Sequence, residues 1–228
     1  MAQLSTMNQI FDILSKKDGI IGIHARPGLG KTTLMLQIVD EVNKRKDGTA
    51  LIFSMAESQA QLIHRMQQMN ISCDRVVIDD TSHPTAEYMQ TRIKQARNVS
   101  ILCIDYLQLL EQAVAEKLRE ISEKYGIPIV VNGILPRGFE NYGQTGDLEQ
   151  CSVLEQIAQQ KYFLIYDFLA LIRRDQGCVG AEFLVKKYWH WEPVDVIMEW
   201  DTKETKFEFG ITTRKAEVIT YDAAIHPL

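Results

Sequence analysis

A short loop with the sequence ARPGLGKTT, residues 25–33, lies between two patterns of different periodicity. The residues before it, GIIGIH, form an apolar run typical of a buried strand. In the segment after it, TTLMLQIVDEVNKRK, Leu34, Ile38 and Val39 recur at helical spacing. A strand that passes through a glycine-containing loop directly into a helix predicts a phosphate-binding loop. An ordinary glycine turn before a helix is the simpler alternative, and the flanking pattern disfavours it.

The residue types of this loop suit a bound phosphate. Ala25 holds the first motif position, where glycine is commoner, and Gly30, Lys31 and Thr32 close the motif. Gly28 and Gly30 allow successive backbone N–H groups to turn toward an anion, and the positive end of the helix dipole adds to the attraction. We expect Lys31 to reach the β and γ phosphates and the Thr32 hydroxyl to bind Mg²⁺. The predicted nucleotide-binding residues are Ala25, Arg26, Pro27, Gly28, Leu29, Gly30, Lys31, Thr32 and Thr33.

The composition favours one domain inside the cell. A chain of 228 residues without a Pro-, Gly- or Ser-rich linker suits a single α/β domain. The formal charge of −5 gives no general argument for nucleic acid, so any DNA contact needs a local basic patch. The four cysteines are widely spaced, and the five histidines show no metal-ligand spacing, which favours reduced thiols and no structural metal. We see no signal peptide and no long apolar run, and we expect a cytoplasmic protein.

Apolar runs alternate with helical patterns along the first two thirds of the chain. The runs cover residues 50–54, 76–79, 101–107, 127–135 and 161–168, and between the third and fourth of them Val114, Leu118, Ile121 and Tyr125 fall at helical spacing. This alternation predicts an α/β fold with a mostly parallel, twisted sheet flanked by helices. Beyond residue 180, short runs of period-two character predict antiparallel strands at the C-terminal edge.

A second element of a nucleotide site follows one of these runs. The segment ILCID places four apolar residues before Asp105. An acidic residue at the end of a neighbouring strand holds the magnesium of a P-loop ATPase, here through a water molecule. We therefore predict Thr32 and Asp105 as the magnesium site.

Longer segments carry a more specific signal. The chain resembles the ATPase domain of DnaB-type replicative DNA helicases in ARPGLGKTT, LIFSMAESQAQLIHRM (51–66), ILCIDYLQLL (101–110), AEKLREISEKYGIPIVV (115–131) and AEFLVKK (181–187). The resemblance implies a RecA-like P-loop NTPase, ATP and Mg²⁺ as ligands, ring or filament assembly or a helicase partner, and single-stranded DNA. We interpret the chain as a divergent, stand-alone member: one domain over 1–228, with a helix at about 5–17, a core at about 18–209 and a tail at 210–228.

Three positions depart from the family pattern. The resemblance puts the water-activating glutamate at Ala56, the polar sensor glutamine at Ile134 and the arginine that enters a neighbour's site at Trp189. Glu57 and Lys187 are the residues that could replace two of these groups. If they do not, ATP binding survives and turnover becomes very slow, since a lost general base removes about 10² to 10⁴ in rate.

Two hypotheses follow from this pattern. The first is a helicase-type domain that binds ATP-Mg²⁺, hydrolyses it slowly and acts in DNA replication, recombination or repair. The second is a non-hydrolysing ATP-binding paralogue, regulatory or structural, that docks on a helicase or self-assembles. Arg137, after the predicted strand at 127–135, is the candidate DNA contact, and we expect weak affinity because few basic residues surround it.

Overall fold

The computed structural model describes residues 19–25 and 27–134 with their side chains, and residues 162–174, 177–189, 192–201 and 206–209 as backbone. The elements in chain order are β1 (Ile20–Ala25), α2 (Lys31–Arg45), β2 (Thr49–Ser54), α3 (Gln59–Gln68), β3 (Val76–Asp79), α4 (Ala86–Ala96), β4 (Val99–Asp105), the 3-10 turn η1 (Leu107–Leu109), α5 (Gln112–Glu116), α6 (Leu118–Tyr125), β5 (Ile129–Ile134), β6 (Tyr162–Arg174), β7 (Gly177–Trp189), β8 (Glu192–Asp201) and β9 (Lys206–Phe209). The predicted helix at 5–17 and the tail at 210–228 lie outside the described residues.

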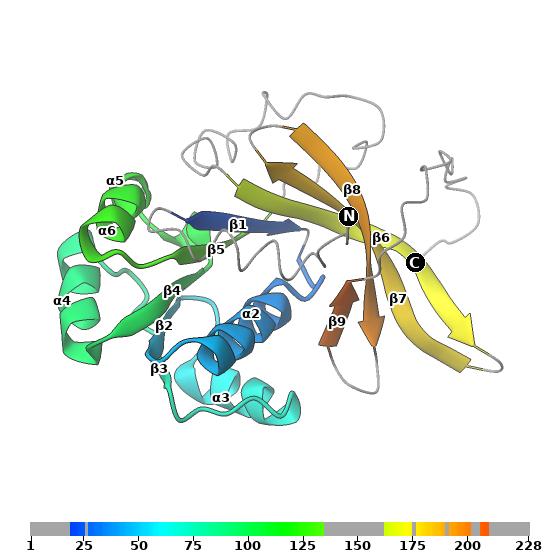
Figure 1. The fold of residues 1–228 in the computed structure, drawn as a ribbon, viewed down its shortest axis with the longest axis horizontal. Coiled ribbons are helices and arrows are strands. Elements are labelled where there is room, and N and C mark those ends of the chain that lie inside the picture. The colour runs from blue at the N-terminus through cyan, green and yellow to red at the C-terminus, as the bar shows by residue number, and fades with distance from the viewer. Residues whose placement is uncertain are drawn as a thin grey trace.

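One sheet connects all the described strands, in the order β3-β2-β4-β5-β1-β6-β7-β8-β9 (Figure 1). The strands from β3 to β6 are parallel to their neighbours. The strands from β6 to β9 pair antiparallel with one another. The parallel strands with their flanking helices confirm the predicted α/β class and its mostly parallel sheet.

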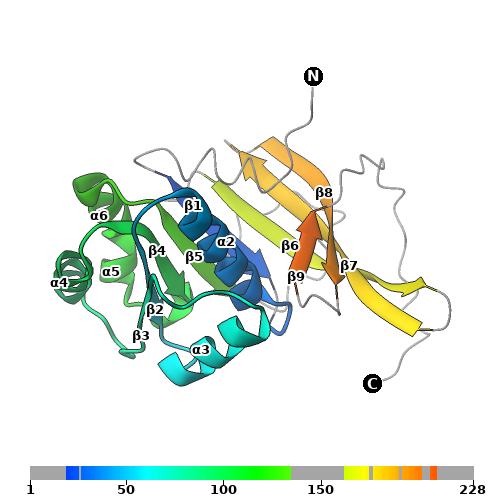
Figure 2. The ribbon, with the colours of Figure 1, turned by 60° about the horizontal axis from the view of Figure 1, so that its bottom comes forward.

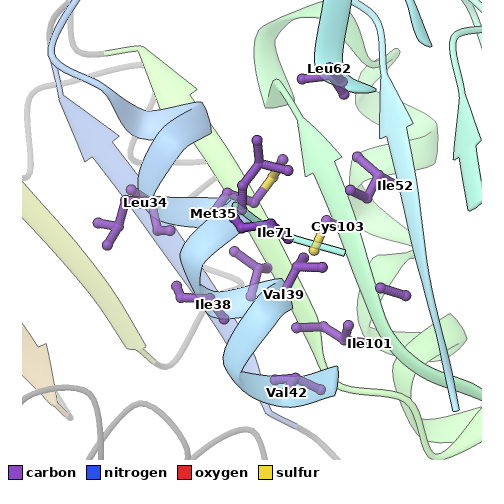
Figure 3. Close-up of a cluster of buried hydrophobic side chains, with 14 of the residues drawn as sticks. Leu34, Met35, Ile38, Val39, Val42, Ile52, Leu62, Ile71, Ile101 and Cys103 are labelled. Atoms are coloured by element: carbon purple, nitrogen blue, oxygen red, sulfur yellow. The ribbon is translucent and has the colours of Figure 1, made fainter. Parts of the chain in front are cut away.

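Apolar side chains alternate between the two faces of the parallel sheet. On β4, Ile101 and Cys103 belong to the core beneath α2 and α3, whereas Leu102 and Ile104 belong to the core beneath α4, α5 and α6. The two layers of helices lie on opposite faces of the sheet (Figure 2). Figure 3 shows side chains of α2 pointing toward Ile101 and Cys103. Burying both faces explains why these strands read as continuous apolar runs.

The strand in the apolar run 101–107 ends at Asp105, as predicted, and η1 then turns the chain. Two other element boundaries differ from the sequence prediction. The helical pattern at 114–125 forms two helices, because the backbone tightens at Lys117, whose N–H donates to the carbonyl of Val114. The fifth run, predicted at 161–168, continues to Arg174. No helix in the described part of the chain is both long enough and apolar enough to cross a membrane.

Candidate nucleotide-binding site

The predicted phosphate loop joins the carboxyl end of β1 to the first turn of α2. Gly28 and Gly30 have φ angles of 79° and 78°, the left-handed region that glycine adopts without strain. Gly30 caps α2 without a side-chain hydrogen bond, and the first turn contains no acidic residue. The first N–H groups of a helix lack partners within the helix, so this end of α2 is suited to bind an anion.

Lys31 begins α2 with its side chain largely buried, at 8% exposure. Its Nζ donates a 3.1 Å hydrogen bond to the carbonyl oxygen of Ala25, the last residue of β1. Burial lowers the pKa of Lys31, and the nearby charge of Asp105 opposes this effect. A partly desolvated cation beside helix N–H groups is an electrostatic complement to phosphate.

Thr32 and Asp105 meet across the helix–sheet boundary. The Thr32 hydroxyl donates a 2.7 Å hydrogen bond to Oδ2 of Asp105, which is 2% exposed at the end of β4. Burial raises the pKa of Asp105 and the charge of Glu57 adds to this, whereas hydrogen bonds from Thr32 and Asn132 and the charge of Lys31 oppose it. The carboxylate therefore lies in a site that favours an added cation.

The oxygen atoms at this position fit magnesium. Mg²⁺ takes hard oxygen ligands and is usually bound by one or two side chains together with substrate phosphates and water. The Thr32 hydroxyl and the Asp105 carboxylate provide such oxygens beside the phosphate loop. Among the described residues, no group of three or more His, Cys, Asp or Glu side chains could hold a metal by itself.

The region after β2 lacks a free carboxylate at position 56. Ala56 is exposed in the turn that follows Ser54. Glu57 is directed to α3, where both carboxylate oxygens accept 2.9 Å hydrogen bonds from Nη2 of Arg65. The hydroxyl of Ser54 also donates to the carbonyl oxygen of Glu57 at 2.6 Å, which fixes the turn.

Ile134 lies at the predicted sensor position and ends β5. Its backbone makes two hydrogen bonds with the side chain of Gln108. Its N–H donates to Oε1 of Gln108 at 3.0 Å, and Nε2 of Gln108 donates back to its carbonyl oxygen at 2.9 Å. Gln108 belongs to η1, directly after β4. The sequence motif IDYLQLL contained this glutamine, yet its contact with β5 could not be read from the sequence.

Asn132 is the site residue that sequence reasoning missed. It is fully buried on β5, and its Nδ2 donates a 3.0 Å hydrogen bond to Oδ1 of Asp105. The only signal in the sequence is a single amide inside the otherwise apolar run IPIVVNGIL. The structure thus brings together Lys31, Thr32, Asp105 and Asn132.

Four of the predicted positions receive no side-chain description. Arg26 and Arg137 lie outside the described residues. Lys187 and Trp189 belong to β7, which the structure gives as backbone. Their roles stay predictions.

Comparisons with known proteins agree with the resemblance seen in the sequence. A family model described as an AAA domain matches residues 14–135, more than half of the chain. Curated relatives include a probable replicative DNA helicase of Guillardia theta, 26% identical over 68% of this chain and 33% of that protein. Another is the replicative DNA helicase DnaC of Bacillus subtilis (strain 168), 25% identical over 67% of this chain and 44% of that protein. The chain spans less than half the length of these relatives.

Solved structures show the same fold. A solved ATPase domain aligns with a TM-score of 0.63 at 17% identity over 84% of both chains. A DnaB-like replicative helicase, whose structure concerns its interactions with primase, aligns with a TM-score of 0.64 at 16% identity over 85% of this chain and 57% of that one. The chain belongs to the AAA domain family and has the fold of a DnaB-type ATPase domain.

Proposed function

We propose that this DnaB-like ATPase domain binds ATP with Mg²⁺ and hydrolyses it slowly. The observation that carries the proposal is the 2.7 Å hydrogen bond between Thr32 and Asp105, beside the buried Lys31. Lys31 and Thr32 lie on α2, and Asp105 lies on β4. The packing of these two elements does not require an ammonium group, a hydroxyl and a carboxylate to meet at the N-terminus of α2.

Each group has a distinct part in this proposal. The N–H groups at the start of α2 hold the phosphates, and Lys31 exchanges the carbonyl of Ala25 for a phosphate oxygen. Thr32 would bind the magnesium directly, and Asp105 would hold it through a water molecule. The bound metal would neutralise charge on the phosphates.

Slow turnover is proposed because no carboxylate is free at the position of the general base. Ala56 has no ionisable group, and Glu57 is engaged by Arg65. The same observation favours the second candidate function, a non-hydrolysing ATP-binding paralogue that is regulatory or structural. Turnover measurements separate the two.

The wider role is proposed from the relatives. Those relatives are named as replicative DNA helicases, and one solved neighbour is described with primase. We propose that this chain acts in the cytoplasm in DNA replication, recombination or repair, as part of a homo-oligomer or with a helicase partner. Binding of single-stranded DNA would be weak, because the chain carries a net charge of −5.

Titration calorimetry with a non-hydrolysable ATP analogue tests nucleotide binding. The unmodified chain should bind the analogue with Mg²⁺, and Lys31→Ala should abolish the heat signal. Lys44→Ala is the matched control, because Lys44 lies on the exposed side of the last turn of the same helix, paired with Asp40. Equal affinity in the Lys31→Ala and Lys44→Ala variants would contradict the proposed site.

A further inference from the structure

Asn132 is a fully buried amide in a strand whose other core positions are apolar. Its strand neighbour on β1 is Ile23, and Val130, two residues earlier on the same face of β5, packs into the core beneath α2 and α3. A leucine at this position would keep that core continuous. An asparagine therefore calls for an explanation beyond packing.

The contacts of Asn132 point toward the nucleotide site. Its Nδ2 donates to Oδ1 of Asp105 at 3.0 Å and also lies 3.6 Å from Sδ of Met35 on α2. Because an ionised carboxylate only accepts hydrogen bonds, the amide presents its donor to Asp105. The two oxygens of Asp105 are then divided between Asn132 on β5 and Thr32 on α2.

The other end of the amide is unused. Oδ1 of Asn132 is buried and accepts no hydrogen bond within the described part of the chain. An acceptor buried without a partner costs free energy, so packing alone does not account for this residue. A water molecule beside the carboxylate would supply the missing donor.

Asn132 also lies near the predicted sensor position. Side chains two residues apart on a strand point to the same face, so Asn132 and Ile134 share a face of β5. Asn132 lies two residues before Ile134, the last residue of the strand. Ile134 itself is apolar and engages Gln108 through its backbone. On this face of β5 the polar side chain is therefore at position 132, two residues before the predicted sensor position.

We infer that Asn132 is a positioning residue of the magnesium site: it fixes the Asp105 carboxylate by donating to Oδ1 and leaves Oδ2 facing Thr32 and the metal position. The inference rests on the proposed nucleotide function. Partners that orient metal-binding groups typically change metal affinity by 10- to 100-fold when removed.

The test compares the affinity for a non-hydrolysable ATP analogue with Mg²⁺ and with a chelator, by calorimetry. Asn132→Leu should reduce the Mg²⁺-dependent gain in affinity by about tenfold, and leave the metal-free affinity unchanged. Asn43→Leu is the matched control, because Asn43 on α2 is also a buried amide. Its Nδ2 donates to the carbonyl oxygen of Arg75, and its Oδ1 has no hydrogen-bond partner among the described residues. The control should keep the full gain. Thermal unfolding checks that each variant is folded.

The outcomes separate this inference from the proposed function. A folded Asn132→Leu variant with an unchanged Mg²⁺ gain, or with equal losses in both conditions, overturns the positioning role while nucleotide binding stands. If the unmodified chain does not bind the Mg²⁺ analogue, the proposed function fails and the inference fails with it. Asn132→Ala removes the same donor without adding volume, and should show the same selective loss. If both variants unfold, Asn132 is a structural residue and the inference is wrong.

Discussion

Both carboxylate oxygens of Glu57 lie 2.9 Å from Nη2 of Arg65, eight residues further along the chain on α3. This ion pair directs the carboxylate toward α3 and engages both of its oxygen atoms. The resemblance places the water-orienting glutamate at position 56, which is Ala56 in this chain. Glu57 lies one residue later and is held in an ion pair, so it does not match that glutamate in position or in environment.

Glu57→Gln should leave the turnover of ATP within a few-fold of that of the unmodified chain. The reason is that the residue serves the turn between β2 and α3 rather than proton transfer. Steady-state phosphate release measures this. A fall of about 10² or more, the usual effect of losing a general base, would identify Glu57 as that base. Glu123→Gln, at an exposed position of α6, is a control for the loss of a negative charge.

Ala56→Glu should raise turnover only modestly. A new carboxylate at this position would still lack the partners that the resemblance places at positions 134 and 189, and groups that act as a unit are not additive. Phosphate release at saturating ATP is the measurement. A gain of 10² or more would show that position 56 alone limits the rate.

The placement of the candidate site residues was predictable where it depends on local sequence. The phosphate loop follows from a strand, a glycine loop and a helix in immediate succession, and Asp105 follows from its place at the end of an apolar run. Asn132 could not be predicted, because its partner lies on a strand separated from it by η1 and two helices. Which strand ends meet depends on the order β2-β4-β5-β1, which local periodicity does not contain. The contact between Gln108 and Ile134 could not be predicted either, because it depends on how η1 orients the Gln108 side chain toward β5.

Asp105→Asn should stabilise the nucleotide-free protein at neutral pH and abolish the Mg²⁺-dependent gain in nucleotide affinity. Burial raises the pKa of Asp105, so the fold opposes its charge. Urea unfolding at pH 7 should show a higher midpoint for the variant. An unchanged or lower midpoint would mean that the hydrogen bonds from Thr32 and Asn132 outweigh the cost of burial.

Gly133→Ala should destabilise the fold by about 1–3 kcal/mol, the usual range for overpacking a core. A Cβ at this position would overlap the ring of His24, which is fully buried opposite Gly133 in the pairing of β1 and β5. Urea unfolding of the two single variants and of His24→Ala with Gly133→Ala completes a double-mutant cycle. If the losses of unfolding free energy are additive, the His24 ring does not contribute to the cost of Gly133→Ala.

The ionisation of Asp79 should make the free energy of unfolding depend on pH in the acid range. Burial alone would raise its pKa, but hydrogen bonds from Thr81, Tyr88 and Arg92 prevail and hold the pKa below its ordinary value. The native state thus binds this proton less readily than the unfolded state, so the contribution is complete above the ordinary Asp pKa and is lost as pH falls toward the native value. The difference in unfolding free energy between the unmodified chain and Asp79→Asn should therefore shrink as the pH falls from about 5 through the ordinary Asp pKa of about 3.9 and below. A difference that stays constant across this range would contradict the expected role of Asp79.

The most direct test of slow turnover is steady-state phosphate release by the unmodified chain at saturating ATP and Mg²⁺, with and without single-stranded DNA. We expect a rate far below the roughly 1 to 10³ s⁻¹ typical of enzymes, with little stimulation by DNA, from protein that calorimetry shows to bind the nucleotide. Hydrolysis within that typical range, strongly stimulated by single-stranded DNA, would contradict the proposed slow turnover.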